Sequence, residues 1–272
     1  MKRYKPTSPG RRHRVDIERN VSRGKPERSL VRGLTEKAGR SKGKISMRHQ
    51  GGRVKRKYRT IDFKRDKLGI PARVASLEYD PNRGADIALL YYKDGEKRYI
   101  LAPEGLAVDG EVLAGEDVRA ETGNAMPIAK IPLGVSIHNI ELQPGRGGQI
   151  VRAAGAKAEV VAKPGKYVHV KLPSGEVRKI LGVCYATVGG VSNPELKSRK
   201  LGKAGRSRHL GIRPSVRGTV MAPNAHPHGG GEGKTSIGMP SPKTPWGKKT
   251  RGVKTRRRKH TTKYIVKDRR KK

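Results

Sequence analysis

The stretch Tyr167-Val168-His169-Val170-Lys171-Leu172 decides the fold class. In an extended chain, Val168, Val170 and Leu172 point to one side, and the residues between them point to the other. An apolar face that repeats at every second residue is typical of an antiparallel strand with one buried side. The pattern therefore predicts a half-buried β-strand.

Similar apolar runs recur along the central part of the chain, separated by turn residues such as Asp94-Gly95 and Pro173-Ser174-Gly175. We expect strands at residues 73–79, 86–92, 97–102, 111–113, 134–142, 149–153, 158–162, 167–172, 176–181 and 184–188. A short helix could form near residues 193–199. Two series of short strands, divided near residues 123–127, predict a mostly β protein with two small β-barrels in tandem.

Charge separates this centre from the two ends of the chain. The 272 residues include 63 Lys and Arg and 23 Asp and Glu, a formal net charge of +40. Residues 1–60 carry +17 and residues 200–272 carry +20, whereas residues 61–199 carry only +3. Leu, Ile, Val and Phe make up 27% of the centre and 13% of the flanks. Below about 20%, a highly charged segment buries too little apolar surface to fold alone. We therefore expect residues 61–199 to fold independently, between long, basic, largely irregular extensions.

Several classes of protein are disfavoured by the composition. No apolar run approaches the ~18–20 residues of a membrane span, and no secretory leader follows Met1. A single cysteine, Cys184, excludes a disulfide framework and a multi-cysteine metal site, and its apolar strand predicts a buried thiol rather than a nucleophile. The acidic residues are scattered on strands and turns, and nothing marks a pocket for acid–base catalysis, so no enzyme activity is predicted. We also expect no cofactor, no metal, no small-molecule substrate and no membrane partner.

The segment from His226 to Gly233, His-Pro-His-Gly-Gly-Gly-Glu-Gly, allows four interpretations. His226 and His228 could ligate a metal, but no further ligand is close by. His226 could act as a general base. The glycines could form a flexible linker. The interpretation that we favour is close approach of the backbone to a folded nucleic acid, because glycine has no Cβ to keep phosphates and sugars away.

Dense basic runs, including Arg11-Arg12-His13-Arg14 and residues 53–59 and 251–258, indicate a polyanionic partner. The chain shows no helix-turn-helix, zinc-finger or basic-zipper pattern of the kind that reads duplex DNA. Small β-barrels with basic extensions fit irregular, folded RNA better.

Blocks of residues from near the start to near the end carry a family resemblance. They include Lys5-Pro6-Thr7-Ser8-Pro9-Gly10-Arg11-Arg12, Leu77-Glu78-Tyr79-Asp80-Pro81-Asn82-Arg83, Leu201-Gly202-Lys203-Ala204-Gly205-Arg206, His226 to Gly233, and Thr244-Pro245-Trp246-Gly247. In these blocks the chain resembles the universal large-subunit ribosomal protein number two family, of bacterial or organelle type.

The resemblance implies an oligonucleotide-binding-type barrel followed by an SH3-like barrel, and a primary role in binding large-subunit rRNA. It also implies support of assembly, subunit association, tRNA binding and the peptidyl-transferase region, with small-subunit rRNA and other large-subunit proteins as further partners. A family histidine with a disputed role in peptide-bond formation corresponds to His226. The family usually has Val-Asp before that histidine, whereas this chain has Asn224-Ala225.

These arguments divide the chain into an N-terminal extension (1–60), an oligonucleotide-binding-type barrel (61–124), an SH3-like barrel (125–199) and a Gly-rich C-terminal extension (200–272). The expected location is the ribosome in the cytoplasm, bacterial rather than organellar. Two alternatives are a peptidyl transferase that uses His226 and a non-specific compactor of nucleic acid. The expected RNA-binding residues are Arg11, Arg12, Arg53, Lys55, Arg56, Lys57, Arg59, Lys64, Arg65, Arg83, Lys203, Arg206, Arg208, His226, His228, Gly229, Gly230, Gly231, Trp246, Lys254, Arg256, Arg257 and Arg258.

Overall fold

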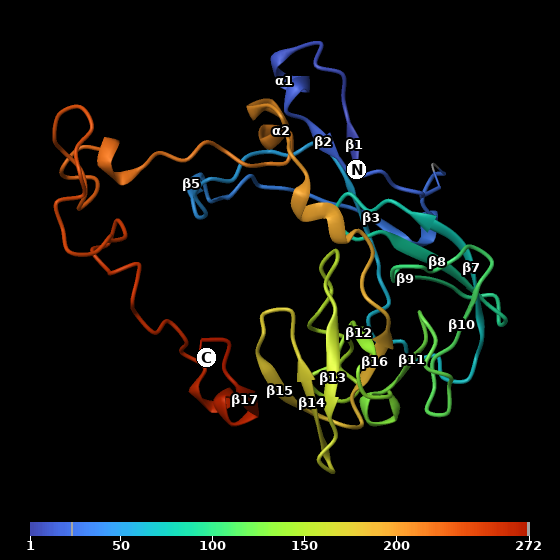
Figure 1. The fold of residues 1–272 in the computed structure, drawn as a ribbon. Helices are drawn as coiled ribbons and strands as arrows, with labels where there is room; N and C mark the ends of the chain where they lie inside the picture. Colours follow the sequence, from blue (N-terminus) through green and yellow to red (C-terminus); the bar gives the residue numbers. More distant parts are fainter. Residues whose placement is uncertain (23, 271–272) are drawn as a thin grey trace. The chain divides into compact units, whose positions relative to one another are not determined.

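The computed structural model describes residues 1–22 and 24–270, and the fold is mostly β (Figure 1), as predicted. The strands are β1 Lys2–Arg3, β2 Val15–Asp16, β3 Val31–Gly33, β4 Arg40–Ser41, β5 Lys44–Ile45, β6 Lys57–Arg59, β7 Ala72–Glu78, β8 Ile87–Tyr92, β9 Lys97–Leu101, β10 Glu111–Val112, β11 Ala125–Pro127, β12 Ser136–His138, β13 Ala158–Ala162, β14 Tyr167–Lys171, β15 Val177–Leu181, β16 Tyr185–Val188 and β17 Ile265–Lys267. The helices are α1 Pro9–Arg12 and α2 Ala204–His209, with 3-10 turns η1 Arg28–Leu30, η2 Ile128–Lys130, η3 Pro194–Ser198, η4 Gly218–Val220 and η5 Lys259–Tyr264.

The chain forms two compact units. The barrel unit comprises Met1–Thr35, Lys55–Arg206 and Thr261–Lys272, and the glycine-rich unit comprises Glu36–Val54 and Ser207–His260. Each unit is therefore assembled from segments that are far apart in the sequence.

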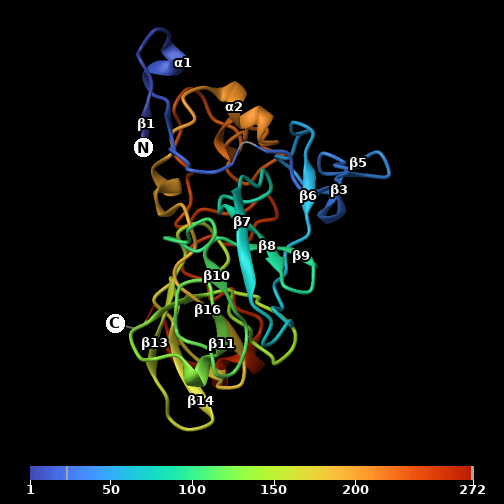
Figure 2. The ribbon, with the colours of Figure 1, turned by 90° about the vertical axis from the view of Figure 1, so that its right-hand side faces the viewer.

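The first sheet of the barrel unit has the order β10-β7-β8-β9, with every pair antiparallel (Figure 2). Its strands lie within one residue of the predicted bounds at each end. Side chains from the two faces enter two apolar clusters, one around Val74, Leu90 and Ile100 and the other around Ile87 and Tyr99. Burial on both faces explains why residues 86–92 are almost uniformly apolar instead of alternating.

The second sheet has the order β11-β16-β12-β13-β14-β15-β17 and is also antiparallel. In β14, Val168 and Val170 are fully buried, whereas Tyr167 and His169 are partly exposed and Lys171 is exposed, which confirms the alternation predicted from the sequence. Two predictions were wrong. Residues 149–153 form only an isolated bridge at Ile150, and the strand predicted at residues 134–142 is limited to β12. Asn139 and Val151 have positive φ angles (49° and 56°), which interrupt an extended strand.

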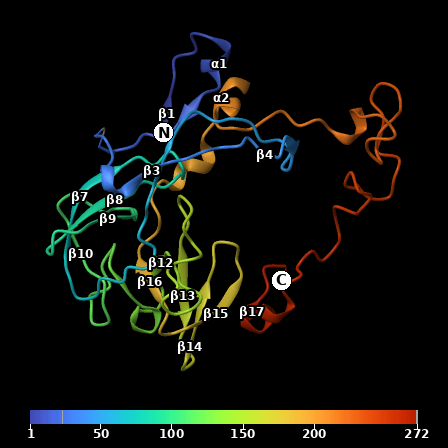
Figure 3. The same ribbon diagram turned by 180° about the vertical axis from the view of Figure 1, so that it is seen from behind.

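Residues of both extensions join the barrel unit. β1 pairs with β2, and β3 with β6, in the N-terminal part. At the other end of the chain, β17 pairs with β15 and extends the second sheet (Figure 1, Figure 3). The short helical segment expected near residues 193–199 is the 3-10 turn η3. The independent folding of residues 61–199 stays a prediction.

His138, on β12, is a buried imidazole in the second sheet. It is 1% exposed, and its Nδ1 lies 2.9 Å from the carbonyl oxygen of Gly189. The pKa of His138 is lowered from 6.5 to about 4, mainly by burial and to a smaller extent by the positive charge of Arg65, against the opposing effect of the Gly189 contact. His138 is therefore neutral in the folded protein near pH 7.

We expect the barrel unit to lose stability as the pH falls from 6.5 to 4. In that range the unfolded chain binds a proton at His138 and the folded chain does not, so acid favours unfolding. The difference between the two pKa values corresponds to ~3 kcal/mol. Urea unfolding at a series of pH values measures this loss in the full chain. His138→Gln, which keeps a donor for Gly189, should flatten the slope over this range, and an unchanged slope would contradict the assignment.

Candidate nucleic-acid interface

The glycine-rich unit is strongly cationic and has no apolar core. All of its 73 residues are described, and they include 19 Lys and Arg against 2 Asp and Glu, a net charge of +17. No apolar side chain of the unit is buried, and Trp246, its largest side chain, is 75% exposed. Hydrogen bonds between backbone groups, such as Gly51 N–H to the Gly211 carbonyl (2.8 Å), shape the unit instead. A segment of this kind needs a polyanion to neutralise it.

His226 is the one polar side chain that the glycine-rich unit buries, with 8% of its surface exposed. Its Nδ1 accepts a hydrogen bond from the backbone N–H of His228 (3.0 Å). His228 in turn accepts a hydrogen bond at Nε2 from the backbone N–H of Lys243 (2.8 Å). The two rings lie 4.8 Å apart. A nitrogen that accepts an N–H bond carries no proton, so neutral His226 has its proton on Nε2. The two histidines thus connect the segment from His226 to Gly233 with residues near Lys243.

Gly218 provides the space for the His226 ring. A Cβ at Gly218 would lie 2.4 Å from ring atoms of His226, a distance that no side chain tolerates. Gly230 has a different role, because its φ of +86° is a conformation that residues with a Cβ rarely adopt. Sequence reasoning found the glycines near His226 but did not find Gly218, which lies eight residues before that histidine and carries no local signal.

Most of the predicted RNA-binding side chains lie at the surface. The exposed ones are Arg11, Arg12, Lys55, Lys57, Lys64, Lys203, Arg208, Trp246, Lys254, Arg256, Arg257 and Arg258, and Arg53, Arg56, Arg59 and His228 are partly exposed. Gly229 and Gly230 are partly exposed and Gly231 is exposed. The side chains belong to both units: Arg53 and those from Arg208 onward lie in the glycine-rich unit, and the others lie in the barrel unit.

Three predicted arginines are instead engaged within the barrel unit. Arg65 is 3% exposed, and its Nη1 donates a hydrogen bond to the Gly123 carbonyl at 3.2 Å. Arg83 forms an ion pair with the buried Asp80 at 2.6 Å. Arg206 forms an ion pair with Asp16 at 3.1 Å. These positions favour a structural role for the three guanidinium groups over direct contact with RNA.

Asp16 binds side chains from two segments of the barrel unit that are far apart in the sequence. Its carboxylate accepts hydrogen bonds from Tyr4 (2.9 Å), Arg14 (2.7 Å), Arg199 (3.2 Å) and Arg206 (3.1 Å). Burial alone would raise the pKa of Asp16, but the hydrogen bonds from Arg206, Arg14 and Tyr4 lower it well below its ordinary value of 3.8. Sequence reasoning missed Asp16, because its partners Arg199 and Arg206 are more than 180 residues away.

We expect Asp16→Asn to loosen the first sixteen residues. The variant keeps the size of the side chain but removes the charge that holds the arginines, at a cost of ~2–3 kcal/mol. Because the folded pKa is lowered, the stabilisation by Asp16 is complete above pH 3.8 and is lost as the pH falls below that value. Hydrogen exchange at residues 1–16 near pH 7 measures the effect. Glu18→Gln, which changes an exposed carboxylate, is the control and should leave exchange unchanged. Equal exchange in the Asp16 variant and the unmodified chain would contradict the role.

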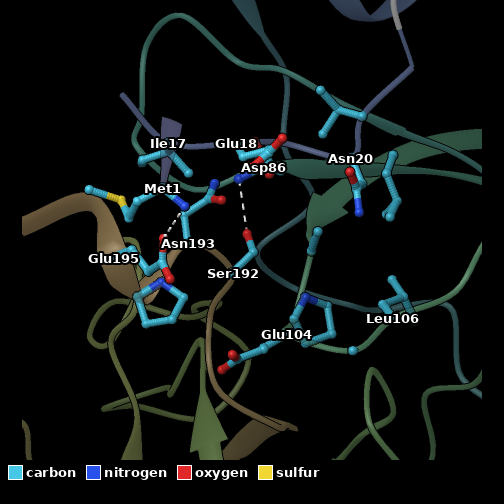
Figure 4. A pocket seen from close by; sticks show the side chains of 16 residues that line it. Met1, Ile17, Glu18, Asn20, Asp86, Glu104, Leu106, Ser192, Asn193 and Glu195 are labelled. Carbon is cyan, nitrogen blue, oxygen red and sulfur yellow. Dashed lines mark hydrogen bonds and ion pairs between the residues drawn. The ribbon is translucent and has the colours of Figure 1, made fainter. Parts of the chain in front are cut away.

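One pocket of the barrel unit is acidic (Figure 4). It has a volume of about 510 Å³, and its lining includes the carboxylates Glu18, Asp86, Glu104 and Glu195. Asp86 is paired with Arg19 at 2.7 Å, and its backbone N–H donates to the Ser192 hydroxyl at 3.0 Å. The charge of this pocket is opposite to the one that a phosphate ligand needs, so we do not assign RNA binding to it.

Cys184 is fully buried, as predicted, and burial raises the pKa of its thiol to about 11, which leaves little thiolate to act as a nucleophile. Within residues 1–22 and 24–270, no group of three or more His, Cys, Asp or Glu side chains could hold a metal ion. In the same part of the chain, no helix has the length and apolar character that a membrane crossing requires.

Comparison with known protein families identifies both halves of the chain. Residues 27–114 match the family described as Ribosomal Proteins L2, RNA binding N-terminal domain. Residues 121–247 match the family described as Ribosomal Proteins L2, C-terminal domain. The chain belongs to the ribosomal protein L2 family.

Membership of the L2 family confirms the resemblance drawn from the sequence. The two barrels are the oligonucleotide-binding-type barrel and the SH3-like barrel of this family, in that order. The protein has a structural, RNA-binding role in the large ribosomal subunit and takes part in translation. Its place is accordingly the ribosome.

Proposed function

We propose that the protein is a primary rRNA-binding protein that supports assembly of the large subunit, subunit association, tRNA binding and the architecture of the peptidyl-transferase region. The observation that carries the proposal is the glycine-rich unit, which has a net charge of +17 and no buried apolar side chain. Large-subunit rRNA supplies the negative charge that such a unit needs. Small-subunit rRNA and other large-subunit proteins are the further partners.

The exposed cations and the buried cations have different roles in this proposal. Exposed side chains such as Arg11, Lys203 and Arg257 neutralise phosphates and release counterions. Arg65, Arg83 and Arg206 hold the barrel unit together through Gly123, Asp80 and Asp16. In this proposal the functional parts of the chain are the N-terminal extension (1–60), the oligonucleotide-binding-type barrel (61–124), the SH3-like barrel (125–199) and the C-terminal extension (200–272).

His226 acts in this proposal as a structural residue and not as a proton carrier. Its Nδ1 is occupied by the His228 backbone N–H, and Ala225 stands where a carboxylate would have to orient the ring. The ring is also buried against Gly218. The sequence predicts His226 as an RNA-binding residue, whereas this packing favours an indirect contribution of the ring, through the shape of the loop. A peptidyl transferase without RNA would need a freely accessible base at this position.

Binding assays with the full chain test the proposal. We expect a large-subunit rRNA fragment to bind roughly 10³-fold or more tightly than a random duplex DNA of equal length, as specific recognition requires. Equal affinity for the two would favour the non-specific compactor. Peptide-bond formation by the purified protein with small substrates and no RNA would favour the enzyme.

A further inference from the structure

Trp246 is the only tryptophan of the chain and is 75% exposed. Tryptophan is the largest apolar side chain, and proteins usually bury most of its surface. Here the ring lies in a unit that has no apolar core. Its exposure therefore suggests that a ligand covers the ring when the protein is bound to its partner.

The backbone around Trp246 forms a tight hairpin. The Thr244 carbonyl accepts a hydrogen bond from Gly247 N–H (2.9 Å), and Thr244 N–H donates to the Lys248 carbonyl (2.8 Å). Gly247 has a φ of +78°, which closes a three-residue turn of the type common in hairpins. Farther from the turn, Thr250 N–H donates a hydrogen bond to the Pro242 carbonyl (2.9 Å) and links the two arms of the hairpin. The ring thus projects from an ordered turn.

Charge around the ring identifies the kind of ligand. The guanidinium of Arg48 lies 5.2 Å from the centroid of the Trp246 ring, within the range of a cation–π contact. Lys248 and Lys249 follow in the sequence and are both exposed. A flat apolar ring beside cations suits a ligand that has both a π-face and a negative charge. An unpaired nucleotide has both, since its base can stack and its phosphate can pair with a cation.

We propose that Trp246 is a stacking platform for one unpaired base of bound RNA, with Arg48 on the ring and Lys248 and Lys249 near the adjacent phosphates. The inference rests on the proposed RNA-binding function and specifies the ligand at this position as a single-stranded nucleotide. Stacking uses the π-face that every base has, so recognition here tolerates different sequences.

The fluorescence of the single tryptophan reports directly on this site. The probes are an oligoadenylate of about twelve nucleotides and an oligomer with the same number of phosphates in which the bases are absent. With the full chain, we expect strong quenching by the oligoadenylate and little by the abasic oligomer. Equal quenching by both would overturn the proposal, because phosphates alone would then explain the signal.

Affinity measurements with variants provide a second test. We expect Trp246→Ala to weaken binding of a labelled oligoadenylate by about 5- to 150-fold, whereas Trp246→Phe, which keeps a stacking ring, should retain most of the affinity. The abasic oligomer should bind the unmodified chain and both variants equally. Since the side chain is exposed, the alanine variant should keep its circular dichroism spectrum. Equal affinity of all three proteins for oligoadenylate would overturn the proposal.

Three further outcomes separate this inference from its alternatives. If the unmodified chain and Trp246→Ala bind a large-subunit rRNA fragment equally tightly, the stacking platform is wrong while the proposed function stands. If rRNA binds no better than duplex DNA, the proposed function fails even when oligoadenylate quenches the ring. A blue shift with phosphatidylglycerol vesicles and no quenching by oligoadenylate would assign the ring to a lipid surface and overturn the proposal.

Discussion

Replacing the five cations Arg251, Lys254, Arg256, Arg257 and Arg258 with glutamine is expected to lower the slope of log K against log salt by about 3.5–4.5 for rRNA binding. Each cation that meets a phosphate releases about 0.7–0.9 counterions, depending on the strandedness of the nucleic acid. All five side chains are exposed, in a stretch without regular secondary structure. The corresponding loss of affinity is roughly a thousandfold near 0.15 M salt.

A matched control distinguishes position from total charge. It replaces five exposed lysines of the barrel unit with glutamine, namely Lys93, Lys157, Lys163, Lys166 and Lys197. Both variants have the same net charge, and we expect the control to change the slope by less than half as much. Titration of a large-subunit rRNA fragment at several salt concentrations measures both. Equal slopes for the two variants would show that residues 251–258 contact RNA phosphates no more than the lysines of the barrel unit do.

The second large effect is expected at the loop that contains His226 and Gly230. We expect Gly230→Val to impair assembly of the large subunit at least as much as His226→Ala. A β-branched residue is strained at a φ of +86°, and its Cβ would lie 3.0 Å from the Pro223 ring. The amount of the variant protein incorporated into large subunits in cells measures the effect. Wild-type incorporation of Gly230→Val would show that the loop shape is not required.

His226→Gln tests the catalytic alternative, in large subunits that contain this variant. Glutamine can accept the His228 N–H through its side-chain oxygen but cannot transfer protons near neutral pH. We therefore expect assembled His226→Gln particles to keep most of their rate of peptide-bond formation. General acid–base catalysis typically contributes ~10²–10⁴-fold. A loss of that size in fully assembled particles, with Gly230→Val harmless, would favour a catalytic His226.

Local sequence patterns were sufficient to predict the barrels and the basic extensions. Strands such as β14 and β8 appear within one residue of their expected bounds, because alternation and apolar runs reflect burial by neighbours of similar character. The predictions failed where the backbone departs from the extended form at isolated positions. Val151 has a positive φ angle that a β-branched residue rarely adopts, and Asn139 has one that asparagine adopts only at some positions. The candidate site was predicted by residue type, and most of its cations are indeed exposed.

The sequence by itself determined the mostly β fold, the polyanionic partner and the family, because charge, apolar content and short motifs are properties of neighbouring residues. Only the tertiary structure decided which arginines are exposed and which are engaged within the protein. Arg65 lies in the interior and Arg206 on Asp16, a residue 190 positions away, and no local pattern distinguishes them from exposed arginines. The same holds for His226, whose burial depends on the missing side chain of Gly218. Contacts between distant segments depend on how the chain packs, and that information is not contained in any short stretch of sequence.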